Sequence, residues 1–209
     1  MRKLIFLFLI GLLFLIETLE VNSEKQVFTI CIDPGHGSLD GGSSANNVLE
    51  KDINLAVALL LEEELVSLGY RVILTRKTDE TVIPFNKKRD LNQRIEIINC
   101  SNADLFLSIH CNSFPNNKYY GAQTFYYTKQ NEYLAYLIQN ELKRLTLTTR
   151  YHKEITDIYL LKNVVIAGVL IECGFISNEE EALKLATKEY QTVIAKAISY
   201  GVSHYLELL

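Results

Sequence analysis

The sequence of 209 residues contains no tryptophan, only three prolines, no internal repeat and no low-complexity segment. The absence of a repeat argues against solenoids and propellers, in which one short unit recurs along the chain. The absence of biased segments argues against extended disorder. Basic residues are not in excess, because 21 Lys and Arg face 25 Asp and Glu and give a net charge of -4 at pH 7. We therefore expect no surface for nucleic acid.

Cysteine is scarce, with Cys31, Cys100, Cys111 and Cys173 as the four examples. A chain of this length with so few cysteines does not depend on a disulfide framework, although export would permit disulfides. The sequence favours free, buried cysteines and leaves their oxidation state open. With 48% hydrophobic and 22% charged residues, the composition is that of a globular protein, and the length predicts one domain with a short appendage.

The N-terminus differs from the rest of the chain. Met1-Arg2-Lys3 precedes an uninterrupted apolar run over residues 4–16, which has the length of a signal-peptide hydrophobic region. A buried core helix is the alternative, but the run has no polar face. No small-x-small cleavage site follows, so a retained anchor is slightly favoured over a cleaved signal. We predict a signal peptide or membrane anchor over residues 1–24, a folded domain over residues 25–209 and a location outside the cytoplasm.

Apolar runs and helical periodicities alternate along the rest of the sequence. Helices with an apolar stripe are expected at 50–68, 90–99, 134–145 and 190–206. Capping boxes are expected at Asp90 with Gln93 and at Ser177 with Glu180. Strands are expected at 27–33, 70–75, 104–110, 121–127 and 164–172. This alternation predicts an α/β domain with a largely parallel sheet.

Three chemically capable side chains follow or close expected strands. His36 comes just after the first strand, His110 closes the third, and Glu172 closes the strand at 164–172. Because sites in open α/β sheets form at the carboxyl ends of the strands, we expect these three groups at one edge of the sheet.

His36, Glu50 and His110 could bind one zinc ion, since catalytic zinc takes three N or O ligands and keeps one open position. The spacing is not a short local motif, so each residue also has a structural interpretation. His36 could be a turn residue after Pro-Gly, Glu50 a carboxylate favoured by a helix N-terminus, and His110 a hydrogen-bonded histidine at the strand end. Glu172 is harder to explain structurally, because it follows an apolar run where a carboxylate is costly unless paired or functional.

Cys111 and Cys173 lie next to His110 and Glu172 in the sequence. Strand side chains alternate between faces, so these thiols are expected to point away from the site and could meet behind the sheet. We do not expect them to be ligands.

Five stretches, in order, resemble the zinc-dependent N-acetylmuramoyl-L-alanine amidases of catalytic type 3: ICIDPGHGSLDGG, the Glu50 region, ADLFLSIHCNS, GAQTFYY and LIECGFISNEEE. The resemblance runs from about residue 27 to the C-terminus. The small size, without a wall-binding domain, resembles the germination-specific branch that acts on spore cortex.

The resemblance implies a six-stranded sheet flanked by helices, one zinc ion on His36, Glu50 and His110, and Glu172 as the catalytic carboxylate. The implied reaction is hydrolysis of the peptidoglycan amide that joins the lactyl group of N-acetylmuramic acid to L-alanine. The chain is expected to act outside the cytoplasm, and the germination branch implies the forespore or cortex. Contact with the membrane is expected only through the N-terminal segment. An exported activator protein could be needed to complete the zinc site. Two alternatives stay open: a zinc exopeptidase, and a non-catalytic or partner-dependent wall-binding domain.

Overall fold

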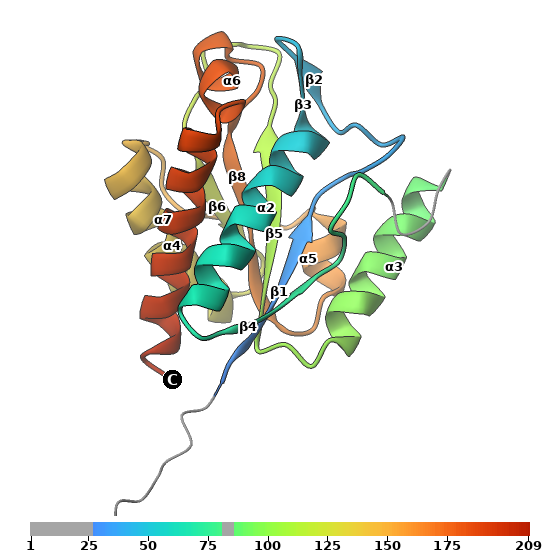
Figure 1. The fold of residues 1–209 in the computed structure, drawn as a ribbon, viewed down its shortest axis with the longest axis vertical. Helices are drawn as coiled ribbons and strands as arrows, with labels where there is room; N and C mark the ends of the chain where they lie inside the picture. The colour runs from blue at the N-terminus through green and yellow to red at the C-terminus, as the bar shows by residue number, and fades with distance from the viewer. Residues whose placement is uncertain (1–26, 81–85) are drawn as a thin grey trace, which may run out of the picture.

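A computed structural model describes residues 27–80 and 86–209, which form a sheet covered by helices on both faces (Figure 1). The export segment predicted over residues 1–24 lies outside the described residues. None of the helices in the described ranges is long and apolar enough to cross a membrane.

The main sheet has six strands in the order β4-β1-β5-β8-β6-β7. All neighbouring pairs are parallel except β6 and β8, which are antiparallel. The prediction of a largely parallel six-stranded sheet is therefore confirmed. Its strands are β1 (Thr29–Pro34), β4 (Arg71–Leu74), β5 (Leu105–Asn112), β6 (Gln123–Tyr126), β7 (Lys153–Glu154) and β8 (Ala167–Phe175).

Each face of the sheet has its own hydrophobic core. On one face pack α2 (Glu50–Ser67), α4 (Glu132–Thr146) and α7 (Lys188–Leu206), against the larger cluster of buried aliphatic residues. On the other face pack α3 (Lys87–Cys100) and α5 (Tyr159–Asn163), against a smaller cluster that includes Phe106 and Leu170. The short hairpin β2 (Ser44–Ala45) and β3 (Val48–Leu49), the turn η1 (Lys129–Asn131) and α6 (Glu179–Leu185) complete the chain.

The four predicted helices are present, but both predicted capping boxes are wrong. Helix α3 begins earlier than expected, and its cap is Asn86, whose side chain accepts a hydrogen bond from the Arg89 N–H. Helix α6 is capped by Asn178, which accepts from Glu181 N–H. Ser177 lies one residue before this cap, and its hydroxyl accepts a hydrogen bond from the Phe114 N–H in another loop.

The four cysteines are free, and three are buried as expected, whereas Cys100 is exposed. Cys111 and Cys173 belong to the larger core, on the face away from Phe106, and the nearby Cys173 thiol adds to burial in raising the pKa of Cys111. The two side chains therefore point away from the site, as expected, and lie near each other behind the sheet.

Helices α4 and α7 approach closely because α7 carries a glycine at the contact. A Cβ placed on Gly201 would lie 2.5 Å from Ile138 Cα and 2.8 Å from its backbone nitrogen. Such a distance is below any normal contact, and the obstacle is backbone rather than a movable side chain. The glycine thus sets the spacing of the two helices.

We expect Gly201→Ala to lower the free energy of unfolding by about 1–3 kcal/mol, as overpacking of a core does. Urea denaturation of the purified protein measures it. Lys196→Ala on the exposed side of α7 is the matched control and should change stability by less than about 0.5 kcal/mol. Equal stabilities of Gly201→Ala and the wild type would contradict the steric role of the glycine.

Candidate active site

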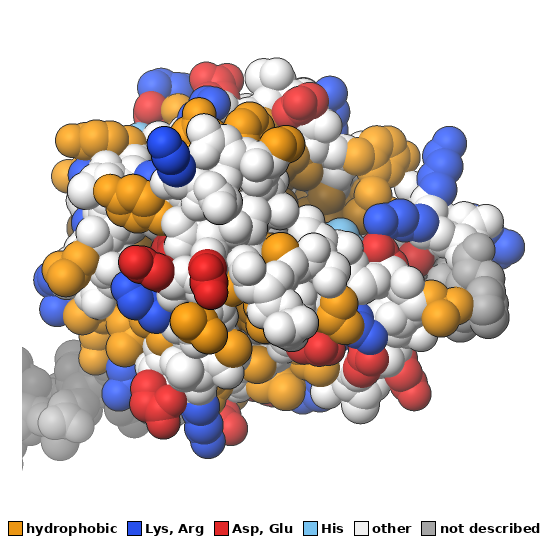
Figure 2. All heavy atoms as spheres, turned by 90° about the horizontal axis from the view of Figure 1, so that it is seen from above, with side chains coloured by type: hydrophobic (Ala, Val, Ile, Leu, Met, Phe, Trp, Pro, Cys, Tyr) orange, Lys and Arg blue, Asp and Glu red, His pale blue; other side chains and the backbone are white. Residues whose placement is uncertain are grey.

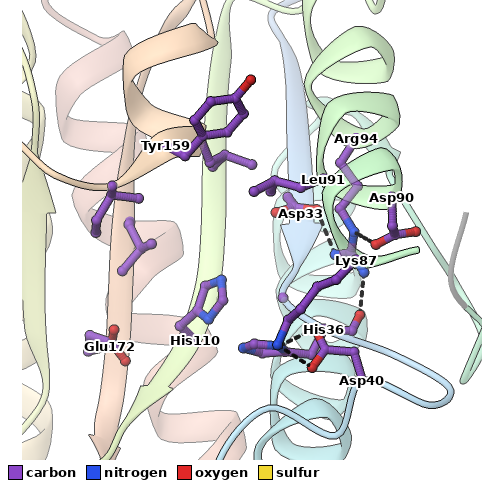
Figure 3. A pocket seen from close by; sticks show the side chains of 14 residues that line it. Asp33, His36, Asp40, Lys87, Asp90, Leu91, Arg94, His110, Tyr159 and Glu172 are labelled. Carbon is purple, nitrogen blue, oxygen red and sulfur yellow. Dashed lines mark hydrogen bonds and ion pairs between the residues drawn. The ribbon is translucent and has the colours of Figure 1, made fainter. Parts of the chain in front are cut away.

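The sheet brings the predicted site residues to its carboxyl edge. His36 lies on the loop directly after β1, and His110 and Glu172 are register partners on the adjacent strands β5 and β8. Glu50 is the first residue of α2, which starts where the β2–β3 hairpin ends. Figure 3 shows His36, His110 and Glu172 around one pocket, with His110 in the middle. All four predicted residues are therefore neighbours in space.

His36, Glu50 and His110 form a compact group of possible metal donors. One oxygen, Glu50 Oε1, lies 3.2 Å from His36 Nε2 and 2.8 Å from His110 Nδ1. The two imidazole rings meet edge to face, with centroids 5.0 Å apart and an angle of 81° between planes. One ligand atom from each residue lies within 4.8 Å of the others.

The Glu50 side chain is 4% exposed and its oxygens are fully engaged. Oε2 accepts a hydrogen bond from Ser43 N–H at 2.8 Å, and Oε1 accepts from the Cys111 N–H at 3.3 Å. Burial opposes ionisation, but the hydrogen bonds from His110 and His36 hold the pKa of the Glu50 carboxyl well below its ordinary value. Glu50 is therefore a permanently ionised anchor for positive charge.

The donor set fits zinc in chemistry and in spacing. Two imidazole nitrogens and one carboxylate oxygen form a known catalytic zinc set. Zinc bonds of this type place tetrahedral donors about 3.4 Å apart. The contacts of 2.8 and 3.2 Å to Glu50 Oε1 are somewhat shorter than this, and all donor atoms of the set lie within 4.8 Å of one another, so small side-chain shifts would accommodate the ion.

Two glycines make room for this cluster. A Cβ on Gly35 would lie 2.3 Å from His110 Cε1, so only glycine lets that ring pack against the loop. At Gly42, whose φ is +67°, a Cβ would lie 2.6 Å from Glu50 Oε2 and 2.7 Å from His36 Cδ2. Gly35 and Gly42 thus leave room for the side chains of the three donors.

Glu172 is a half-buried residue whose carboxylate is of a different kind. Its Oε2 has no hydrogen-bond partner among the described residues. Burial raises the pKa of Glu172 to about 7, against the opposing charge of His110. A carboxylate with that pKa can take up and release a proton near neutral pH, which is what general acid–base catalysis requires.

The pocket around these groups has one apolar wall and one charged rim. Seen from the carboxyl ends of the strands, a histidine side chain lies at the floor of a hollow between apolar and charged side chains (Figure 2). The charged rim includes Asp40, Lys87 and Asp90. The apolar wall comes from α3, α5 and β8 and comprises Leu91, Ile158, Tyr159, Leu160 and Leu170.

Sequence reasoning missed a buried arginine that holds the loop carrying His36. Arg94 donates to Asp33 Oδ1 at 3.1 Å, to Asp90 Oδ2 at 2.8 Å and to the Pro34 carbonyl at 2.7 Å, and it also donates to the His36 carbonyl. Burial disfavours the charge, but Asp33 and Asp90 raise the pKa of Arg94 above its ordinary value.

A second arginine holds the same loop from the other side. Arg76 donates to the carbonyls of Pro34, Gly35 and Lys51, each at 3.0 Å. Asp33 could have been suspected as a charged residue at the end of a buried strand. Nothing local in the sequence marks the two arginines.

A family model described as N-acetylmuramoyl-L-alanine amidase matches residues 30–204. The germination-specific N-acetylmuramoyl-L-alanine amidase of Bacillus subtilis is 45% identical, over 84% of this chain and 78% of that protein. The N-acetylmuramoyl-L-alanine amidase LytC of B. subtilis is 34% identical, over 85% of this chain and 35% of that protein.

Solved structures agree with these relatives. The CwlD amidase from Clostridioides difficile, in complex with the GerS lipoprotein, superposes with a TM-score of 0.82 at 43% identity, over 87% of this chain and all of that one. An N-acetylmuramoyl-L-alanine amidase from Clostridium difficile 630 gives a TM-score of 0.80 at 30% identity, over 87% and 97% of the two chains.

The matched region contains the three candidate donors and Glu172, and it spans nearly all the described fold. Amidases of this family are zinc-dependent and act on peptidoglycan outside the cytoplasm. The predictions of a peptidoglycan amidase and of its fold are confirmed: the chain belongs to the family of N-acetylmuramoyl-L-alanine amidases.

Proposed function

We propose that this amidase works with one zinc ion held by His36, Glu50 and His110, and with Glu172 as the general base. The observation that carries the proposal is the contrast between two neighbouring carboxylates. Glu50 is ionised and engaged by both histidines, whereas Glu172 has a buried oxygen without a partner among the described residues and a pKa near neutrality. The first is suited to hold a cation and the second to move a proton.

The scissile bond is the amide between the lactyl carbonyl of N-acetylmuramic acid and the L-alanine nitrogen. Bound zinc would supply a Lewis acid for that carbonyl and would make water more acidic. Glu172 Oε2 takes a proton from the attacking water and gives it to the leaving alanine nitrogen. The products are a lactyl carboxylate on the glycan and a stem peptide with a free amino terminus. Glu50 takes no part in proton transfer, because its carboxylate is held ionised: it accepts from the Ser43 and Cys111 N–H groups and from Asn54 Nδ2, and it faces both imidazoles.

Cortex peptidoglycan of spores is the proposed setting. The support is the 45% identity with a germination-specific amidase over most of both chains. We further propose that residues 1–24 direct the chain across the membrane, either as a cleaved signal or as a retained anchor, and that residues 25–209 act in the forespore or cortex compartment. An exported activator protein is the proposed partner, because a relative with 43% identity was solved in complex with a lipoprotein.

Digestion of purified peptidoglycan by the zinc-loaded protein should release stem peptides with an L-alanine amino terminus and leave unsubstituted glycan. Mass analysis of the soluble products measures both, and prior treatment with a zinc chelator should abolish release. New reducing sugar ends, or free D-alanine alone, would identify a glycosidase or an exopeptidase instead.

The two carboxylates should respond differently to removal. Glu50→Ala should lose zinc on dialysis, together with activity, because a metal ligand is gone. Glu172→Ala should keep about one zinc per chain and lose turnover by about 10²–10⁴-fold, because only proton transfer is gone. Bound metal and amidase rate are measured on both purified variants.

Excess zinc separates the roles further, since it can restore part of the activity of Glu50→Ala but none of that of Glu172→Ala. Glu172→Gln keeps the volume of the side chain and controls for a packing defect. If Glu172→Ala loses zinc while Glu50→Ala keeps it, the two roles are reversed.

Export can be tested on intact vegetative cells that express the full chain, because in a sporulating cell the mother-cell membrane would keep the reagent away from the forespore and cortex. An impermeant amine reagent should label the mature protein from outside the membrane, because its lysines lie on the extracytoplasmic side. N-terminal sequencing of the labelled protein then distinguishes a retained anchor from a cleaved signal. A protein that the reagent labels only after the cells are lysed would contradict the proposed location.

A further inference from the structure

We propose that Asp40 is a positioning residue for the metal site: its carboxylate holds the proton of His36 on Nδ1 and so presents Nε2 as the ligand atom. The inference rests on the proposed role of His36 in binding zinc. Asp40 Oδ2 lies 2.8 Å from His36 Nδ1, and at the opposite side of the ring Nε2 faces Glu50 Oε1 at 3.2 Å. Figure 3 shows the two side chains together on the loop after β1.

Ring chemistry makes this contact consequential. A neutral imidazole carries one proton, and only the other nitrogen has a lone pair for a metal. A carboxylate at Nδ1 is an acceptor and favours the tautomer with the proton at Nδ1. The lone pair is then on Nε2, which is the nitrogen that points into the donor cluster.

His36 needs such a contact more than His110 does. His110 belongs to a hydrogen-bonded strand, and its ring packs directly against Gly35. His36 lies on a loop with a left-handed backbone, φ +62°, between glycines. Its main chain is fixed by Arg94, but its ring has no strand to orient it. Asp40 supplies the missing restraint on the ring.

Asp40 is itself fixed on two sides. Its main chain forms a paired bridge with Gly37, with N–O distances of 2.9 and 3.0 Å. Its other oxygen, Oδ1, accepts from Lys87 Nζ at 2.8 Å and from the Gly42 N–H at 3.4 Å. With Oδ1 occupied by these donors, Oδ2 is left for the imidazole. Carboxylates placed in this way on metal-binding histidines typically change metal affinity by about 10–100-fold when removed.

A second carboxylate that contacts the same loop, Asp79 on the segment after β4, offers a matched control. Asp79 accepts a hydrogen bond from Ser38 N–H at 2.8 Å and pairs with Lys51 at 2.6 Å, so it also tethers the loop but does not touch an imidazole. Asp79→Ala removes a loop contact of similar kind. A comparison with Asp40→Ala therefore separates orientation of the ring from general fixing of the loop.

Zinc affinity of the full chain is measured by competition with a chromophoric chelator. We expect Asp40→Ala to weaken zinc binding by about 10–100-fold, Asp40→Asn to weaken it less, and Asp79→Ala to stay within about twofold of the wild type. Thermal unfolding of the metal-free proteins checks that each variant is folded, and Asp40→Asn serves if Asp40→Ala is not. Unchanged affinity in the Asp40 variants, or an equal loss in Asp79→Ala, overturns the inference.

A spectroscopic measurement adds a signature that loop fixing alone does not produce. In the zinc-loaded wild type, long-range proton–nitrogen spectra should show His36 with its proton on Nδ1, and that proton should exchange faster in Asp40→Ala. A proton on Nε2 overturns the inference. Failure of the wild type to bind one zinc at all would instead remove the metal site of the proposed function, and this inference with it.

Discussion

The burial of one carboxylate, that of Glu50, is the constraint on which the site depends. A carboxylate that is 4% exposed is stable only when other groups of the protein replace its water. The replacements come from the loop after β1, from Ser43 before the hairpin and from the end of β5. Two segments far apart in the sequence, the loop between β1 and β2 and the end of β5, are thus tied to the first turn of α2, where the helix dipole also favours negative charge. The three donor side chains lie together because the groups that replace water around the Glu50 carboxylate include both imidazoles.

A second network of buried charges fixes the loop that carries His36. Arg94 and Arg76 together bind the carbonyls of Pro34, Gly35 and His36, which a loop without secondary structure would leave unsatisfied. The cost of burying Arg94 is offset by Asp33 and Asp90. The main chain of the loop after β1 is therefore hydrogen-bonded on both sides, by the Arg76 guanidinium that follows β4 and by the Arg94 guanidinium of α3.

The sequence predicted those features of the fold and the site that can be read from hydrophobic periodicity and from the ends of strands. His36, His110 and Glu172 could be placed at one edge because parallel strands share their carboxyl edge. Glu50 needed the family resemblance, since a spacing of fourteen residues across a loop specifies no geometry. Asn86, and not the expected Asp90, caps α3, because the helix begins at Lys87 and the capping residue is the one that directly precedes the helix.

Other parts of the fold and the site were missed for related reasons. The two-residue strand β7 and the five-residue helix α5 are too short to leave a periodic pattern. The arginines that bind the loop could not be found, because their contacts span more than forty positions of the chain.

The pairing of His110 with Glu172 has a consequence for how such enzymes diversify. Neighbouring strands lie about 4.8 Å apart, and slipping one strand by a single residue turns its side chains to the opposite face. The distance between the proposed ligand and the proposed base is therefore inherited with the hydrogen-bond ladder, and insertions in the loops beyond the strands can reshape access to the cleft while leaving that distance unchanged.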